Sequence, residues 1–104
     1  MGELLDNYER LAARGIRPFR CINHGPTTSM YYADPDGNRV ELQVDNFATP
    51  EEATAWMASP EFAANPIGVD FDPEDYVALG ADDASALARK RPMRSHASAA
   101  SPAR

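Results

Sequence analysis

The stretch Thr28–Asp45 reads TSMYYADPDGNRVELQVD and is the strongest structural signal in this chain. Its first part, residues 28–33, is rich in β-branched and aromatic residues, which favours a strand. Its last part, residues 39–44, alternates polar and apolar residues, as in a strand with one buried face. Between them lies Asp34-Pro35-Asp36-Gly37-Asn38, a run of residues that favour tight turns. The stretch therefore predicts a β-hairpin.

The turn also predicts the register of this hairpin. A turn centred on Asp36 places Tyr31 directly opposite Glu41, so that both side chains share one face of the sheet. The apolar residues of the second strand then lie on the other face, where a helix can cover them: Val40, Leu42 and Val44. We therefore expect Glu41 to point away from that helix.

The elements on either side of the hairpin predict an α+β fold. Upstream, apolar residues at three- and four-residue spacing predict a helix over Glu3–Arg14, and Phe19–Asn23 is interpreted as a further strand. Downstream, a good helix start predicts a helix over Pro50–Ala58, followed by shorter helical segments within residues 61–64 and 67–79. The expected architecture is one helix, a three-stranded antiparallel meander and then C-terminal helices.

Length and composition predict one domain and a tail. A chain of 104 residues suffices for a single small domain, which we assign to residues 1–80. Towards the C-terminus, Ala, Ser, Arg and Pro predominate and large apolar residues become rare. Such a composition cannot build a packed core, so residues 81–104 are predicted to be a disordered tail.

Charge and cysteine content narrow the functional classes. The net charge of −6 argues against binding to nucleic acid. Cys21 is the single cysteine, which rules out an internal disulfide, fits a reducing cytoplasm and is interpreted as a core residue. The sequence has neither the run of about 18 apolar residues of a membrane span nor a signal peptide at its start. We therefore expect a cytoplasmic protein without a membrane partner.

Glu41, Tyr31 and His24 form the candidate site. Ser29 and Tyr31 lie beside Glu41 in the predicted register, and His24 ends the preceding strand. A phenol next to a carboxylate can bind a substrate oxygen, and an imidazole can exchange protons near neutral pH. The three groups therefore suit a metal site or an acid–base site. Two alternatives stay open: Glu41 on a solvated sheet face, and His24 as a loop residue that caps a turn.

The residues 23–47, NHGPTTSMYYADPDGNRVELQVDNF, resemble the last βββ portion of a module in the vicinal oxygen chelate superfamily. This superfamily includes glyoxalases, bleomycin-resistance proteins and extradiol dioxygenases, and the likeness is strongest to small biphenyl-diol and catechol dioxygenases. The pattern YYxDPDGNxxEL carries the resemblance. It implies part of a βαβββ unit in which Glu41 is a metal ligand, Tyr31 hydrogen-bonds the substrate or oxygen, and His24 acts as acid and base.

The resemblance also implies a cofactor and partners. The metal is expected to be divalent, Fe(II) first, with Mn(II) or Zn(II) as alternatives, and the substrate a small aromatic diol or another compound with vicinal oxygens. A homodimer or larger assembly is expected. The family's first strand and its second unit, which carry two histidine ligands, have no counterpart here. We therefore expect the C-terminal part of a longer protein, truncated or started from an internal Met, that binds metal weakly or not at all by itself.

The resemblance leaves three hypotheses for the function of this chain. The first is an oxidoreductase in which the complete protein cleaves the ring of a catechol-type diol with O2. The second is a non-catalytic module of the same fold that binds a small ligand. The third is a metal-dependent isomerase or lyase of the glyoxalase type. Whether this chain alone is active stays open, because only one of the implied metal ligands occurs at a matching position.

Overall fold

The computed structural model of this protein describes residues 1–90. Within this range one antiparallel sheet has the strand order β3-β2-β1-β4. Its strands are β1 (Arg20–Asn23), β2 (Thr27–Ala33), β3 (Arg39–Asp45) and β4 (Val69–Asp70). The helices are α1 (Gly2–Ala12), α2 (Pro50–Met57), α3 (Pro60–Ala64), α4 (Pro73–Leu79) and α5 (Ala81–Lys90). The predicted α+β class, with a helix, antiparallel strands and C-terminal helices, is confirmed.

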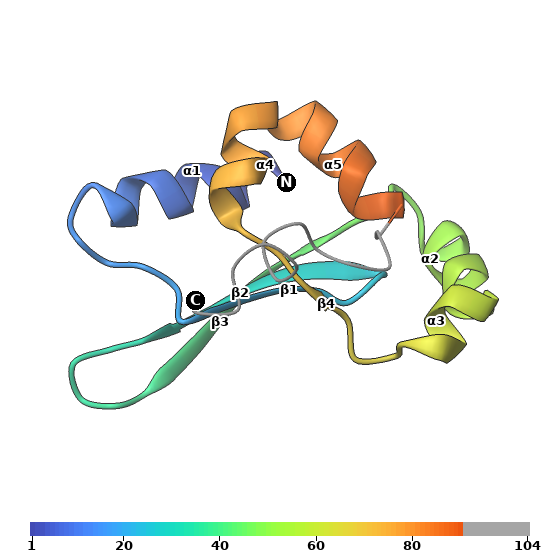
Figure 1. Cartoon of the computed structure of the whole chain (residues 1–104), viewed down its shortest axis with the longest axis horizontal. Coiled ribbons are helices and arrows are strands. Elements are labelled where there is room, and N and C mark those ends of the chain that lie inside the picture. The colour runs from blue at the N-terminus through green and yellow to red at the C-terminus, as the bar shows by residue number, and fades with distance from the viewer. Residues whose placement is uncertain (91–104) are drawn as a thin grey trace.

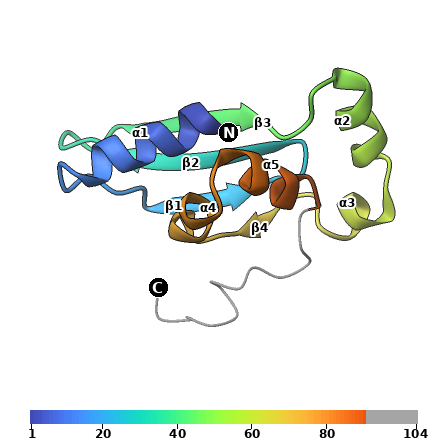
Figure 2. The same cartoon turned by 90° about the horizontal axis from the view of Figure 1, so that it is seen from above.

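The helices form one layer on the sheet. Figures 1 and 2 show α1, α4 and α5 over the same face, with α2 and α3 beyond one end of the strands. The pair α2 and α3 is anchored there by Trp56, whose ring lies where a side chain on Gly25 would project, 2.7 Å from an added Cβ. The opposite face of the sheet is therefore free of these five helices.

The core lies between α1, α4, α5 and the sheet. Leu4, Leu5 and Tyr8 are the buried residues of α1, as the apolar spacing of this segment predicts. Phe71 stacks on Tyr76 with ring centroids 4.3 Å apart. Each fully buried apolar side chain of this size stabilises the fold by about 1.5–3 kcal/mol. Cys21 is part of this core, as predicted.

The hairpin has the predicted register, in which Tyr31 pairs with Glu41 and Met30 with Leu42. Its turn is held by Asp34, whose side chain accepts hydrogen bonds from the backbone N–H groups of Asp36 and Asn38. These hydrogen bonds lower the pKa of Asp34 because they stabilise the carboxylate, and the hydrogen bond from the backbone of Asn38 has the largest effect. The register therefore follows from local turn chemistry, and the order α1-β1-β2-β3 corresponds to the αβββ part of the implied unit.

The predicted meander of three antiparallel strands is present as β1, β2 and β3, and a fourth strand that was not predicted extends it. Strand β4 pairs with β1 through Ile22 opposite Asp70 and Asn23 opposite Val69. A strand of two residues is too short to show the alternation that identifies longer strands. The segment 67–79 is therefore a short strand followed by α4, with Asp72 capping the helix.

The tail predicted over residues 81–104 is incorrect in its first part. Residues 81–90 form α5, in which Ala84 and Ala88 are fully buried. Small side chains let this helix pack closely on the core although it contributes few large apolar residues. Acidic residues in the first turn and basic residues in the last turn suit the helix dipole. The remainder of the predicted tail, 91–104, lies outside the described residues.

The described part of the chain contains no helix with the length and apolar character needed to cross a lipid bilayer.

Candidate functional site

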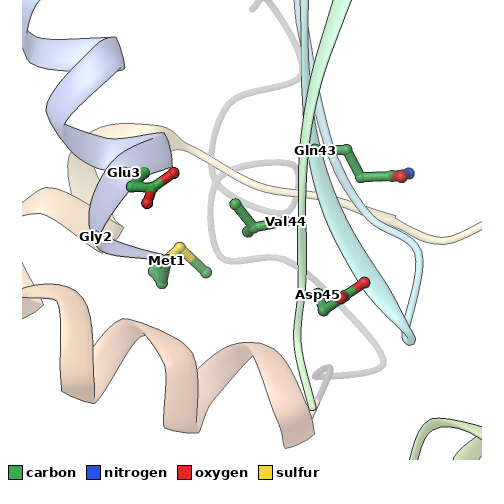
Figure 3. A pocket seen from close by; sticks show the side chains of 6 residues that line it. All are labelled: Met1, Gly2, Glu3, Gln43, Val44 and Asp45. Atoms are coloured by element: carbon green, nitrogen blue, oxygen red, sulfur yellow. The ribbon is translucent and has the colours of Figure 1, made fainter. Parts of the chain in front are cut away.

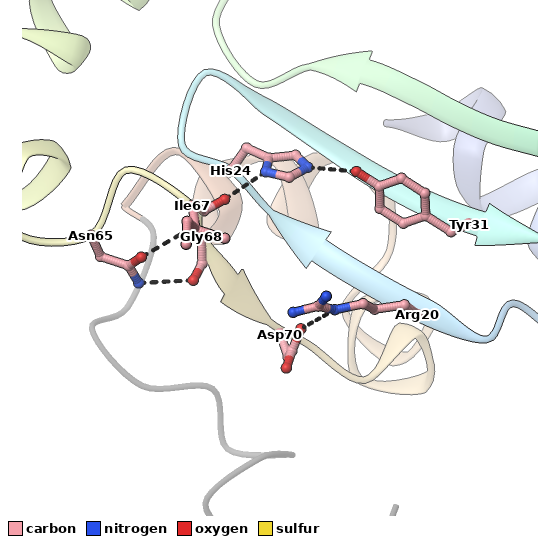
Figure 4. A network of polar contacts seen from close by, with 7 residues as sticks. All are labelled: Arg20, His24, Tyr31, Asn65, Ile67, Gly68 and Asp70. Atoms are coloured by element: carbon pink, nitrogen blue, oxygen red, sulfur yellow. Dashed lines mark hydrogen bonds and ion pairs between the residues drawn. The ribbon is translucent and has the colours of Figure 1, made fainter.

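The candidate site lies on the sheet face that turns away from α1, α4 and α5. Strand pairing places Arg20 beside Tyr31, and Tyr31 beside Glu41, across three neighbouring strands. On the fourth strand, Asp70 forms an ion pair with Arg20 at 3.3 Å (Figure 4). Because side chains alternate between the two faces of a strand, all four side chains project to this face. We call it the open face.

An open depression on this face combines apolar and polar groups. It is lined by Phe19, Arg20, Ile22, Tyr31, Arg39, Val40 and Glu41. Ile22 is only 5% exposed and forms an apolar floor. The Phe19 ring lies 6.3 Å from that of Tyr31 and carries the Arg39 guanidinium over its face at 5.1 Å. This depression therefore offers aromatic and aliphatic contacts next to a phenol and a carboxylate.

His24 and Tyr31 are joined directly, as Figure 4 shows. The Tyr31 hydroxyl lies 2.9 Å from Nε2 of His24, and Nδ1 of His24 lies 2.6 Å from the carbonyl oxygen of Ile67. A carbonyl only accepts hydrogen bonds, so Nδ1 must carry a proton. In the neutral imidazole Nε2 is then the acceptor, and the Tyr31 hydroxyl donates to it.

The carbonyl that orients His24 belongs to a constrained loop before β4. The Asn65 side chain donates to the Gly68 carbonyl at 2.8 Å and accepts from the Gly68 N–H at 3.0 Å (Figure 4). Gly68 has φ +132°, and a Cβ added there would lie 2.6 Å from the Asn23 carbonyl. Only glycine therefore fits at this position. Sequence reasoning missed the loop: its Asn-Pro and Gly residues indicate a turn but do not name its partner.

Glu41 is held by its neighbours on the open face. The Ser29 hydroxyl donates to its Oε2 at 2.8 Å, and the Gln43 amide donates to the same oxygen at 3.2 Å. Ser29 is fully buried whereas Glu41 is exposed. The Glu41 carboxylate therefore accepts a hydrogen bond from a buried hydroxyl and at the same time faces solvent. The predicted direction of Glu41, away from the helix layer, agrees with this contact.

The environment of Tyr31 favours its protonated form. Burial, and then the negative charge of Glu41, raise the pKa of Tyr31 above its usual value of 10.0, while Ser29 and Arg20 act in the opposite direction. The hydroxyl therefore remains a hydrogen-bond donor at neutral pH. This is the form that can donate to Nε2 of His24.

The described residues do not by themselves fit a divalent metal. Across residues 1–90 no three side chains of His, Cys, Asp or Glu converge closely enough to hold one. Both ring nitrogens of His24 are occupied, by Ile67 and Tyr31, and Glu41 is the one predicted metal ligand. A site for Fe(II) with two histidines and one carboxylate would need further ligands.

The chain is homologous to part of the biphenyl-2,3-diol 1,2-dioxygenases. It is 63% identical over 73 residues to biphenyl-2,3-diol 1,2-dioxygenase 2 of Rhodococcus globerulus and 53% identical over 73 residues to biphenyl-2,3-diol 1,2-dioxygenase 3 of the same organism. Each match covers 70% of this chain and 38% of the relative, so the chain spans well under half the length of the relatives it matches.

The match necessarily contains Glu41. A stretch of 73 residues in a chain of 104 begins no later than residue 32 and ends no earlier than residue 73. No family model matches the chain. No solved structure matches it significantly.

Proposed function

We propose that this chain forms part of an extradiol dioxygenase, in which the complete protein cleaves the ring of a catechol-type diol with O2. The observation that carries the proposal is the 63% identity to biphenyl-2,3-diol 1,2-dioxygenase 2 over a stretch that contains Glu41. Glu41 is the carboxylate ligand that this chain contributes to a divalent metal, Fe(II) before Mn(II) or Zn(II). The remaining ligands come from outside the described residues.

Tyr31 and His24 handle the protons of the diol in this proposal. The Tyr31 hydroxyl is protonated and lies 2.9 Å from Nε2 of His24, which accepts its proton in the hydrogen bond. A diol hydroxyl bound at the open face donates to the Tyr31 oxygen, whose own proton lies in the hydrogen bond to Nε2 of His24. A proton that leaves the diol can therefore be passed through Tyr31 to His24 and be returned by the same route. The Ile67 carbonyl supports this role because it holds the proton on Nδ1, so that Nε2 is the nitrogen that accepts.

The depression supports a small aromatic substrate. Ile22 provides an apolar floor, and the rings of Phe19 and Tyr31 lie beside it. Aromatic surfaces pack well against such side chains, whereas the exposed Glu41 in the same lining provides the polar end. A ring with two adjacent hydroxyls therefore matches the chemistry of the depression.

A chimera tests this function. The matching 73-residue stretch of this chain replaces its counterpart in biphenyl-2,3-diol 1,2-dioxygenase 2 of R. globerulus, and ring cleavage and O2 uptake are measured with biphenyl-2,3-diol. We expect an active chimera and a loss of about 100-fold or more in the Glu41→Gln chimera. Glu51→Gln, at an exposed position of α2 within the same stretch, is the matched control and keeps its activity.

Unchanged turnover in the Glu41→Gln chimera, with folding confirmed by circular dichroism, contradicts the proposal. A second function, non-catalytic ligand binding, is favoured by the failure of residues 1–90 to assemble three metal ligands. Equal affinity for biphenyl-2,3-diol with and without a chelator, and no turnover, would support it. Turnover that persists without O2 would instead indicate the isomerase alternative.

A further inference from the structure

Strand β3 forms an edge of the sheet, and its outer backbone groups face away from β2. The strand order places β3 first, with β2 as its neighbour in the described chain. The β2–β3 ladder lies between two further backbone hydrogen bonds. One runs from the Asp34 N–H to the Asn38 carbonyl at the turn, and the other from the Asn46 N–H to the Pro26 carbonyl at the opposite end. Hydrogen-bonded pairs alternate in such a ladder, so residues 40, 42 and 44 bond to β2. Residues 39, 41, 43 and 45 direct their backbone groups outward.

We propose that two copies of this chain pair through β3, antiparallel, about a twofold axis at Leu42. The sequence of β3, RVELQVD, is self-complementary in this register. Arg39 of one protomer lies opposite Asp45 of its partner, and Glu41 lies opposite Gln43. These are the residues with outward backbone groups, so each pair also exchanges two backbone hydrogen bonds.

The charge pattern of β3 selects this register over its neighbours. A shift of the twofold axis to Glu41 would place the two Glu41 carboxylates directly opposite each other. A shift to Gln43 would place Glu41 opposite Asp45. Like charges directly opposite in a sheet are destabilising, whereas the register at Leu42 pairs opposite charges at both ends. Among these three registers, the one at Leu42 is therefore favoured.

Apolar side chains on the helix side of β3 support the same pairing. Val40 is 48% exposed, and in this register it lies opposite Val44 of the partner. Val44 points toward α1, into a pocket beside the strand (Figure 3). The lining of this pocket is Met1, Gly2, Glu3, Gln43, Val44 and Asp45. Val40 of the partner would therefore cover apolar surface at this pocket.

The dimer joins the two open faces edge to edge into one continuous surface. Glu41 and Gln43 project to the open face within one protomer, where the Gln43 amide contacts Glu41 at 3.2 Å. Pairing about Leu42 places a second Gln43, that of the partner, beside each Glu41. The inference rests on the edge of β3 and does not depend on the proposed enzymatic function.

Charge reversal at the two ends of β3 tests the interface. The molar mass of the full chain is measured against concentration by sedimentation and by light scattering. We expect wild-type dimers, and dimerisation weaker by about tenfold or more in Arg39→Asp and in Asp45→Arg, because each variant places like charges opposite.

An equimolar mixture of the two variants should restore dimers. The acid introduced at position 39 of one variant then meets the arginine introduced at position 45 of the other. At the second end of the interface, the unchanged Asp45 meets the unchanged Arg39, as in the wild-type pair. Opposite charges therefore face each other at both ends of the mixed dimer.

The mixture shows that both variants are folded and that the contact is specific. Glu51→Arg, a charge reversal on the exposed surface of α2, is the control and leaves dimerisation unchanged. A wild-type chain that stays monomeric up to about 1 mM overturns the proposal. So does a mixture that is no more dimeric than either variant alone.

Discussion

The Tyr31 hydroxyl and Nε2 of His24 form a hydrogen bond of 2.9 Å that joins the middle of β2 to the residue that directly follows β1. The other ring nitrogen of His24 lies 2.6 Å from the Ile67 carbonyl, 43 residues further along the chain. One backbone carbonyl thus determines which His24 nitrogen carries the proton, and so the direction of the hydrogen bond from Tyr31.

The tautomer of His24 is the first prediction. Long-range nitrogen–proton NMR spectra of the full chain are expected to show the proton on Nδ1 at a pH where the imidazole is neutral. Tyr31→Phe should leave this tautomer unchanged, because the Ile67 carbonyl still accepts from Nδ1. Asn65→Ala removes the two hydrogen bonds that hold the loop and should increase the share of the other tautomer. A proton on Nε2 in the wild-type chain contradicts the assignment.

Metal binding by the chain alone should be weak. Isothermal titration with Fe(II) under anaerobic conditions, or with Mn(II), is expected to give a dissociation constant above about 10⁻⁴ M, because Glu41 lacks two further ligands within residues 1–90. A chelator should not change the urea midpoint of the chain. Stoichiometric binding at micromolar metal that Glu41→Gln abolishes would show that the chain assembles a site by itself.

The buried amide of Asn46 should contribute strongly to stability. Asn46 is 4% exposed and donates to the Gly25 carbonyl at 2.7 Å and to the Asn23 side chain at 3.1 Å, and it accepts from the Thr28 hydroxyl. Asn46→Ala removes three buried hydrogen bonds and takes the donor from the Gly25 carbonyl and the acceptor from the Thr28 hydroxyl, so the free energy of unfolding should fall by about 2–4 kcal/mol in urea titrations. Asn38→Ala, in the exposed turn, should cost about 1 kcal/mol or less. Equal effects of both variants would contradict this account.

Tyr8 should make the chain less stable at high pH. Burial, and then its hydrogen bond to Glu74, raise the pKa of Tyr8 from 10.0 to about 12. Between these values the unfolded chain releases the Tyr8 proton while the folded chain retains it. The free energy of unfolding therefore falls as pH rises through this window and is unaffected by Tyr8 below it.

Urea midpoints at about pH 9 and about pH 11 measure this loss of stability. Tyr8→Phe should lose less stability between the two conditions than the wild-type chain, because it has no proton to release. Tyr31→Phe is the comparison variant, because the pKa of Tyr31 is also raised. Unlike Tyr8, the Tyr31 side chain lies on the open face and has no hydrogen bond to Glu74. An identical pH dependence in wild type and Tyr8→Phe would contradict the role of Tyr8.

The hairpin and the position of Glu41 could be predicted because both depend on neighbouring residues. Asp34 and Gly37 act within the turn, and strict alternation in residues 39–44 then assigns each side chain to one face. The contact between Ser29 and Glu41 follows from the same alternation. Helix α1 could be predicted for the same reason, because the spacing of its apolar residues is a pattern within one segment.

The partner of His24, strand β4 and the burial of α5 could not be predicted in this way. Residues 69–70 carry no periodic pattern, and Asn65 and Gly68 have turn signals that do not indicate what the turn contacts. The alanines of α5 resemble those of a tail until a core is present to pack against them. These features depend on segments far apart in the sequence.

The sequence by itself determined the α+β class, the register of the hairpin and the face that presents Glu41 and Tyr31, because alternation and turn chemistry act over a few residues. Only the tertiary structure decided that Ile67 orients His24 toward Tyr31, that β4 closes one side of the sheet and that β3 is left as its edge. The physical reason is that hydrogen bonds between distant segments depend on how the packed core brings their backbones together.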